Sequence, residues 1–344
     1  MKIAVAGLGF MGSTHLTALR SIPAAEVVAV VSEDPAKRSG DLSKISGNLS
    51  RPGQRLDFSK VKQYTKLEEA LADPAVEAVD LCLPTYLHES AAVDALRAGK
   101  HVLVEKPMAL DGAACDRIIA EAEKSGKVLM CAQVLRFWGD YQPVVSARRS
   151  GKLGNVRSAL FRRRCAAPQW GQWLHDPHKG GGGIFDLLIH DVDMCIHLFG
   201  VPEAVSATGH AYMTKGIDVI TAQLHYNGIP SVVISGGWHH PAAYPFSMEY
   251  TVTFDEATIE YSSASGKPVA VFGDDGQERT AVQAGLEKPE KDGFQAELEY
   301  FIQCASANQA PEICPPAQSA AAVRLMRFLD EARRHNGAKL PCRL

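Results

Sequence analysis

The stretch that decides the fold is MKIAVAGLGFMGSTHLTAL, residues 1–19. Its apolar run KIAVA predicts a buried strand, and a GxGxxG sequence follows at once and opens a helical pattern. In this placement Gly7 permits a tight turn, Gly9 lets backbone amides approach a pyrophosphate, and Gly12 lets helix and strand pack closely. The helix N-terminus adds unpaired N–H groups and partial positive charge. We therefore expect a dinucleotide to bind at Gly7, Gly9, Phe10, Met11 and Gly12.

The next hundred residues continue to alternate short apolar runs with helical patterns. Strands are predicted at 3–6, 27–31, 76–83, 101–104 and 128–131, and helices near 11–21, 66–72, 86–98 and 111–125. This alternation is typical of a parallel sheet with crossover helices, so residues 1–131 are predicted to form an α/β Rossmann dinucleotide-binding domain. Residues 43–60 are polar and glycine-containing, and we interpret them as a surface loop or insertion.

From about residue 155 the periodicity changes. Apolar and polar side chains alternate in 219–226 and 247–254, which predicts half-buried strands of an antiparallel sheet that is open on one face. Apolar stripes at 294–305 and 325–332 predict closing helices. We therefore expect residues 132–344 to form an α+β domain with a large open, mainly antiparallel sheet. Its C-terminal helices are candidates to pack back on the first domain.

Composition excludes several classes of protein. The 344 residues carry 36 Lys and Arg against 39 Asp and Glu, a net charge of −3, so no basic excess points to nucleic acid. No stretch has the roughly 18 apolar residues that a membrane span needs, and the N-terminus lacks a secretory cleavage pattern. The eight cysteines form no CxxC pair and are expected to be reduced core thiols. A cytoplasmic protein with no nucleic-acid or membrane partner is the expectation.

The choice of coenzyme depends on the end of the second predicted strand. A carboxylate at that position would bind the adenosine ribose of NAD, but Ser32 stands there, with Glu33 next. Ser32 with Lys37 or Arg38 could instead bind the 2′-phosphate of NADP. Glu33 would repel that phosphate, or bond the ribose if it points inward, and residues 33–38 could equally be a charged helix start. We favour NADP slightly over NAD.

Glu105-Lys106-Pro107 is the first segment with side chains suited to catalysis. It follows directly on the strand at 101–104, and ligands of open parallel sheets bind outside the carboxyl ends of the strands. The Lys106 ammonium could stabilise a developing alkoxide there, and Glu105 could orient it. The alternative is a charged pair at the end of a strand, capped by proline.

The second such segment, GGGGIFDLLIHDVDMCIHLFG, spans residues 180–200. Asp186, His190, Asp193 and His197 follow one another at i, i+4, i+7 and i+11, one polar stripe on an otherwise apolar helix. The pKa of His190 suits proton exchange with a substrate hydroxyl, and Asp186 could hydrogen-bond the imidazole or a neighbouring hydroxyl. Asp193 and His197 are better explained as structural contacts between this helix and other elements.

A catalytic metal is the alternative to this interpretation. His175, Asp176 and His178 precede the stripe, and histidine and aspartate on one helix face can bind zinc. The sequence has no HExxH and no thiolate at ligand spacing, so no metal is expected.

Candidate substrate contacts in the second domain have aromatic faces or polar tips, which suit a polyol. Each could equally belong to the core or to a subunit contact. The candidates are Arg136, Trp173 and Trp238, followed by Trp138, Trp170, His239 and Tyr244.

Together, these segments resemble the Gfo/Idh/MocA family of oxidoreductases. The likeness covers nearly the whole chain, through GLGFMGSTH, LPTYLHESAAVDALRAGKHVLVEKPMAL, GGGGIFDLLIHDVD and FQAELEYFIQC. The resemblance implies a dinucleotide on the N-terminal domain, a substrate against the open sheet of the second, and dimers or tetramers formed through that sheet. Carried over by position, His190 is the acid–base residue, Lys106 positions substrate and nicotinamide, and Asp186 is their helper.

The expected coenzyme contacts also include Pro84, His88, Glu105 and Lys106. The expected substrate contacts also include Lys106, Asp186 and His190. The reaction that the resemblance implies is hydride transfer between NAD(P) and a secondary alcohol of a sugar, cyclitol or related polyol. Two alternatives stay open. One is an NAD-dependent glycosidase that oxidises transiently and then eliminates. The other is a non-catalytic, dinucleotide-responsive binding module, which need not keep all three side chains.

Overall fold

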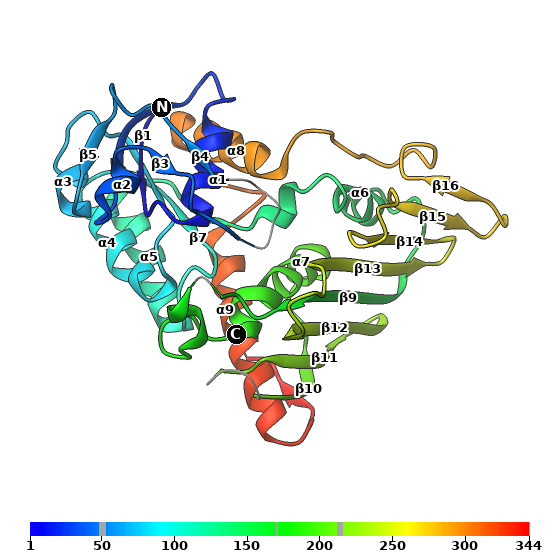
Figure 1. The fold of residues 1–344 in the computed structure, drawn as a ribbon. Helices are drawn as coiled ribbons and strands as arrows, with labels where there is room; N and C mark the ends of the chain where they lie inside the picture. Colours follow the sequence, from blue (N-terminus) through cyan, green and yellow to red (C-terminus); the bar gives the residue numbers. More distant parts are fainter. Residues whose placement is uncertain (48–52, 170, 212–215, 344) are drawn as a thin grey trace. The chain divides into compact units, whose positions relative to one another are not determined.

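The computed structural model describes residues 1–47, 53–169, 171–211 and 216–343. The chain divides into two compact units, which are described separately: Met1–Val134 with Gly293–Ala320, and Leu135–Asp292 with Ala321–Leu344 (Figure 1). Among the described residues, no helix has the length and hydropathy that a membrane span requires.

A six-stranded parallel sheet forms the centre of the first unit, in the order β5-β2-β1-β6-β7-β8 (Figure 1). Its strands are β1 (Lys2–Ala6), β2 (Glu26–Val31), β5 (Lys62–Tyr64), β6 (Ala78–Leu81), β7 (His101–Glu105) and β8 (Leu129–Ala132). The predicted Rossmann fold is confirmed. Sequence periodicity missed the edge strand β5, because its three residues are polar and carry no apolar pattern. The strand order reverses between β1 and β6, where doubly wound sheets bind their ligands.

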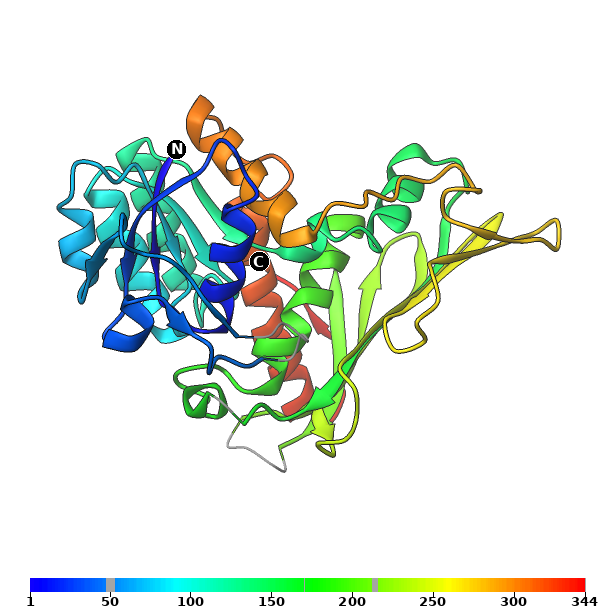
Figure 2. The same ribbon diagram turned by 45° about the horizontal axis from the view of Figure 1, so that its top comes forward.

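Helices cover both faces of this sheet. They are α1 (Phe10–Leu19), α2 (Pro35–Arg38), α3 (Leu67–Leu71), η1 (Thr85–Leu87), α4 (His88–Arg97), α5 (Gly112–Ser125), α8 (Gly293–Ala307) and the start of α9 (Pro316–Arg334). Helix α1 packs beside α8 on one face, and α4 packs beside α5 on the other, as right-handed crossovers on either side of the strand reversal require (Figures 1 and 2). Asp111 caps α5 by accepting the Ala114 N–H at 2.8 Å.

The predicted insertion, residues 43–60, is partly anchored rather than wholly a surface loop. A small antiparallel pair joins β3 (Asp41–Leu42), just before the insertion, to β4 (Gln54–Arg55), within it. Phe58 is buried, and Gly47 packs so closely on the Phe10 ring that an added Cβ would lie 2.3 Å from it. The insertion therefore contacts the helix start that follows the glycine turn. Residues 48–52 lie outside the described part of the chain.

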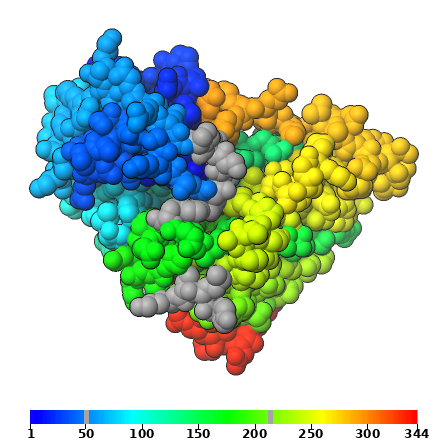
Figure 3. All heavy atoms as spheres, in the orientation of Figure 1, coloured from blue at the N-terminus to red at the C-terminus, as the bar shows by residue number. Residues whose placement is uncertain are grey.

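A nine-stranded sheet dominates the second unit, in the order β16-β15-β14-β13-β9-β12-β11-β10-β17. Its strands are β9 (Val156–Ala166), β10 (Ala204–His210), β11 (Val219–Tyr226), β12 (Ile229–His240), β13 (Ser247–Phe254), β14 (Ala257–Ser262), β15 (Ala270–Gly273), β16 (Glu278–Thr280) and β17 (Leu340–Pro341). Only the pair β9–β12 is parallel among the described pairings, so the predicted open, mainly antiparallel sheet is confirmed. The yellow segment that includes β14 and β15 lies at the surface in Figure 3.

One face of the second sheet is covered by helices. The helical elements are η2 (Val134–Phe137), α6 (Gln142–Ser150), η3 (Gln172–His175), the π-helix η4 (Ile184–Leu188), α7 (Ile189–Phe199) and the remainder of α9. Elements η4 and α7 lie against β9, and η4 also lies against β12. On the opposite face, alternate side chains such as Leu160, Arg162 and Thr221 stay exposed.

Candidate active site

The glycine turn after β1 is shaped for close approach of a ligand to the backbone. Gly7 has φ +92°, and a Cβ added at Gly12 would lie 2.0 Å from the Gly7 carbonyl oxygen, so both positions require glycine. At Gly9, by contrast, an added Cβ would meet no described atom within 4 Å. Gly9 precedes α1, and the described residues place no side-chain cap and no acidic side chain on its first turn. Half-buried Phe10 and Met11 open the helix. This N-terminus fits the pyrophosphate of a dinucleotide.

The end of β2 has both a basic side chain beside Ser32 and a capped helix start, the two alternatives that the sequence left open. Arg38 Nη1 donates to the carbonyl oxygens of Ser32 and Glu33, at 2.6 and 2.9 Å, so its guanidinium is fixed beside the position where NAD enzymes carry an acid. Lys37 is half-buried and Glu33 is exposed. Asp34 caps α2, so the capped-helix interpretation is also correct.

Main-chain bonds fix the Glu105-Lys106-Pro107 segment at the carboxyl end of β7. The Lys106 N–H donates to Glu105 Oε2 at 3.0 Å, and the Lys106 side chain is half-buried. His88 is buried, with Nδ1 2.8 Å from the Pro107 carbonyl oxygen and Nε2 2.8 Å from the carbonyl just before Pro84. Pro84 itself is half-buried. Burial lowers the pKa of His88, so the ring is neutral and its single N–H donates to one of the two carbonyls. A contact between His88 and the coenzyme stays a prediction.

A buried cluster that the sequence did not indicate lies under the same segment. His15 Nδ1 is 2.9 Å from Asp80 Oδ2, and His15 Nε2 is 3.2 Å from Glu105 Oε1. Cys82 Sγ lies 3.4 Å from His15 Nδ1, and burial raises the pKa of this thiol. His15, Asp80 and Cys82 are of metal-ligating types with atoms within 4.8 Å of one another. Because carboxylates already face both ring nitrogens, we interpret the cluster as an ion-pair network.

In the second unit, Asp186 and His190 carry the predicted acid–base chemistry. Asp186 lies in the π-helix η4 and His190 in the first turn of α7, one turn apart, and both are half-buried. A π-turn inside a helix is often found at a functional site. The preceding glycines have a packing role, because Gly182 has φ +79° and an added Cβ would lie 2.9 Å from the Gly216 Cα. Close packing against the chain itself thus explains this run of glycines.

The remaining acidic side chains of α7 form buried ion pairs. Arg136 is 2% exposed and holds Asp193 with two bonds, Nε–Oδ2 at 2.8 Å and Nη2–Oδ1 at 2.7 Å. The Arg136 guanidinium is thus engaged in a buried ion pair, and its contact with substrate stays a prediction. Burial, with a smaller contribution from Arg136, lowers the pKa of His197 to about 4. Asp191, which no sequence pattern had singled out, pairs with Arg163 at 2.9 Å.

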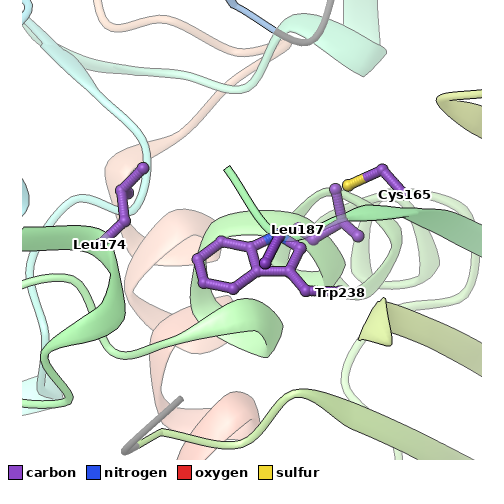
Figure 4. Packing of buried hydrophobic residues seen from close by; sticks show 5 residues of the cluster. Cys165, Leu174, Leu187 and Trp238 are labelled. Carbon is purple, nitrogen blue, oxygen red and sulfur yellow. The ribbon is translucent and has the colours of Figure 1, made fainter. Parts of the chain in front are cut away.

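Trp238, for which a substrate contact stays a prediction, is fully buried. It is 0% exposed, and its indole lies in the core among the side chains of Cys165, Leu174 and Leu187 (Figure 4). Trp173 packs against this cluster and is partly buried, so part of its ring stays accessible.

The other candidates for substrate contact remain predictions. Trp138 and Tyr244 are half-buried, and His239 is exposed. The Tyr244 ring stacks on His240, with centroids 3.9 Å apart. Trp170 lies outside the described residues.

Two family models match the chain. Residues 1–133 match a model described as an oxidoreductase family with an NAD-binding Rossmann fold, GFO_IDH_MocA, and residues 141–260 match the GFO/IDH/MocA C-terminal domain.

Curated relatives are similar at low identity. A myo-inositol 2-dehydrogenase of Thermotoga maritima is 27% identical over 323 residues, which cover 91% of this chain and 90% of the relative. A scyllo-inositol 2-dehydrogenase (NADP(+)) of Bacillus subtilis is 28% identical over 76% of this chain and 69% of its own length. Other matches are shorter, and an uncharacterized oxidoreductase of Schizosaccharomyces pombe is covered over only 42% of its length. The fold is shared with a levoglucosan dehydrogenase solved with NADH and levoglucosan, at a TM-score of 0.82, 15% identity and 99% coverage of both chains.

Proposed function

Because the chain belongs to the Gfo/Idh/MocA family and is an NAD(P)-dependent oxidoreductase, we propose that it interconverts a secondary alcohol and a ketone on a sugar, cyclitol or related polyol. One observation carries this proposal. Lys106, Asp186 and His190 stand half-buried at the three positions from which this chemistry is expected. The named activities of the two inositol dehydrogenases support the choice of substrate class.

Each of the three side chains has a distinct task in this reaction. His190 takes the hydroxyl proton as a general base, a task for which an imidazole nitrogen is chemically suited. The Lys106 ammonium holds the same oxygen while it carries negative charge. Asp186, one helical turn from His190, orients the imidazole or a second hydroxyl. The dinucleotide, bound at the glycine turn, supplies the hydride acceptor at its nicotinamide. The products are a ketone, a reduced coenzyme and one proton.

We propose NADP as the preferred coenzyme. The supporting observation is the Arg38 guanidinium, which the carbonyl oxygens of Ser32 and Glu33 hold beside the end of β2. A fixed guanidinium can bind a phosphate through two parallel hydrogen bonds. Half-buried Lys37 adds positive charge, whereas exposed Glu33 opposes it.

Thermal-shift titration followed by a polyol assay tests substrate class and coenzyme together. Only a coenzyme that binds the folded state raises the midpoint, so NADPH should raise it more than NADH at equal concentration. The preferred coenzyme is then mixed with inositols, levoglucosan and common aldoses, and absorbance of the reduced nicotinamide is followed. In Arg38→Ala, the difference between the midpoint shifts produced by NADPH and by NADH should become smaller. A larger shift with NADH would contradict the NADP proposal, and binding without turnover across the panel would favour a non-catalytic module.

We also propose that the open face of the nine-stranded sheet forms a homodimer or homotetramer. This face exposes the apolar side chains of Leu160 and Phe272, at 37% and 40%, among polar strand residues. An exposed sheet face with apolar positions favours association with a second copy. Size-exclusion chromatography with light scattering should give a mass of two or four chains. A particle of 37.1 kDa at micromolar concentration would contradict this.

A further inference from the structure

The ring of His15 stands between two carboxylates in the interior of the first unit. Its Nδ1 is 2.9 Å from Asp80 Oδ2 and its Nε2 is 3.2 Å from Glu105 Oε1, and the side chain is 0% exposed. The Asp80 contact has hydrogen-bond geometry, and the Glu105 contact is an ion pair by distance. Because ionised carboxylates only accept protons and carry negative charge, both contacts favour a ring in which both nitrogens are protonated. Burial alone would lower the pKa of His15, but the charge of Asp80 raises it well above the usual value. The ring is therefore an imidazolium between two anions.

Glu105 connects this ring to the main chain of Lys106. Its Oε1 faces His15, and its Oε2 accepts the Lys106 N–H at 3.0 Å. Burial would raise the pKa of Glu105, but His15 and Lys106 hold it below its ordinary value, so the carboxylate stays ionised. Each oxygen of one carboxylate thus has its own partner, and the carboxylate cannot turn without losing one of them.

The other groups around the ring come from two more elements. Cys82, just after β6, contributes a neutral thiol, because burial raises its pKa. Helix α8 places the Phe294 ring with its centroid 6.0 Å from that of His15. Among the described contacts, Glu105 is the group that joins the ring to the catalytic segment.

We propose that His15 is a positioning residue for Lys106. Asp80 holds the ring, the ring holds the Glu105 carboxylate, and the carboxylate holds the amide from which the lysine side chain extends. His88 restrains the same segment from its other side, through the Pro107 carbonyl. The effect on catalysis rests on the proposed function, whereas the effect on the amide does not.

Amide hydrogen exchange of the ligand-free protein tests this geometry directly. In His15→Gln, the Lys106 amide should exchange about tenfold faster or more, because a hydrogen bond to a fixed carboxylate is lost. The Val102 amide lies on the same strand as Glu105, β7, and donates to the Val128 carbonyl. It should keep its protection from exchange. In the unaltered protein, the ¹⁵N shifts of His15 should show both nitrogens protonated at about pH 8, where an ordinary histidine is neutral.

Two further variants keep the test decisive. His15→Gln with Asp80→Asn removes the cation and one anion together, so the buried charge stays balanced if the single variant does not fold. This double variant should increase the exchange rate of the Lys106 amide to the same extent as His15→Gln. The matched control is His101→Gln, at the opposite end of β7, where the ring accepts the Val128 N–H. Lys106 protection should not change in this control. Unchanged protection of Lys106 in the His15 variants, or equal loss at Lys106 and Val102, overturns the proposal.

Kinetics then show whether the position of Lys106 matters. We expect kcat of His15→Gln on the best polyol to fall about tenfold or more, while the dissociation constant of the coenzyme stays within about twofold. If the Lys106 amide exchanges faster in His15→Gln but kcat is unaltered, the proposed effect of His15 on catalysis is overturned. If the unmodified protein turns over no polyol, the proposed function fails, and the exchange and ¹⁵N measurements still decide the role of His15.

Discussion

Replacing His190 with asparagine should lower kcat by about 10²–10⁴, the usual contribution of a positioned general base. The alcohol carbon can release hydride only as its hydroxyl proton leaves, and asparagine cannot take that proton. Because His190 lies in the second unit and the glycine turn in the first, coenzyme affinity should stay within about twofold. Steady-state kinetics on the best polyol and a fluorescence titration with reduced coenzyme give the two numbers.

A matched control separates loss of the base from a general disturbance of this segment. His178 is an exposed histidine just before the glycine run, so His178→Asn changes the same side-chain type a few residues away. Its kcat should stay within about twofold of the unmodified enzyme, as expected for an exposed site that makes no contact with substrate. Near-normal turnover of His190→Asn would remove the histidine from the mechanism.

Local periodicity predicted most of the fold because it depends on near neighbours. The alternation in 219–226 and 247–254 corresponds to β11 and β13, and the buried runs of the first domain correspond to five parallel strands. A strand buried on one or two faces must carry this pattern, whatever lies around it. The edge strand β5 was missed because its residues have little surface to bury. The π-turn at η4 was missed because apolar spacing does not distinguish it from an α-helical turn.

Pairing between distant residues could not be predicted from a single sequence. Arg136 and Asp193 are separated by 57 residues, and His15 and Asp80 by 65. Periodicity shows that a polar side chain faces inward, but not which element meets it there. The stripe on α7 was therefore correctly identified as needing partners, whereas Arg136 was assigned to substrate. The same limit applies to Trp238, because an aromatic side chain suits a core as well as a sugar site.

The strongest effect on stability should come from Asp191→Ala in the second unit. Arg163 is 2% exposed and donates from Nε and Nη2 to the two Asp191 oxygens, at 2.9 and 3.0 Å. Without the carboxylate, the buried guanidinium keeps, among its contacts with described residues, the Tyr141 hydroxyl at 3.2 Å and Met248 Sδ at 3.5 Å. Breaking such a pair costs about 3–5 kcal/mol of unfolding free energy. Urea denaturation followed by circular dichroism measures this loss.

Two controls show whether the uncompensated charge is the cause. Asp275→Ala removes a carboxylate from a surface pair with Arg279, and should cost less than about 1 kcal/mol because solvent screens that pair. Arg163→Met combined with Asp191→Leu removes both buried charges, and should recover most of the loss because neither ion is left to be desolvated. A loss below about 1 kcal/mol in Asp191→Ala, or a double variant as unstable as the single one, would show that packing around α7, rather than charge compensation, holds this helix on the sheet.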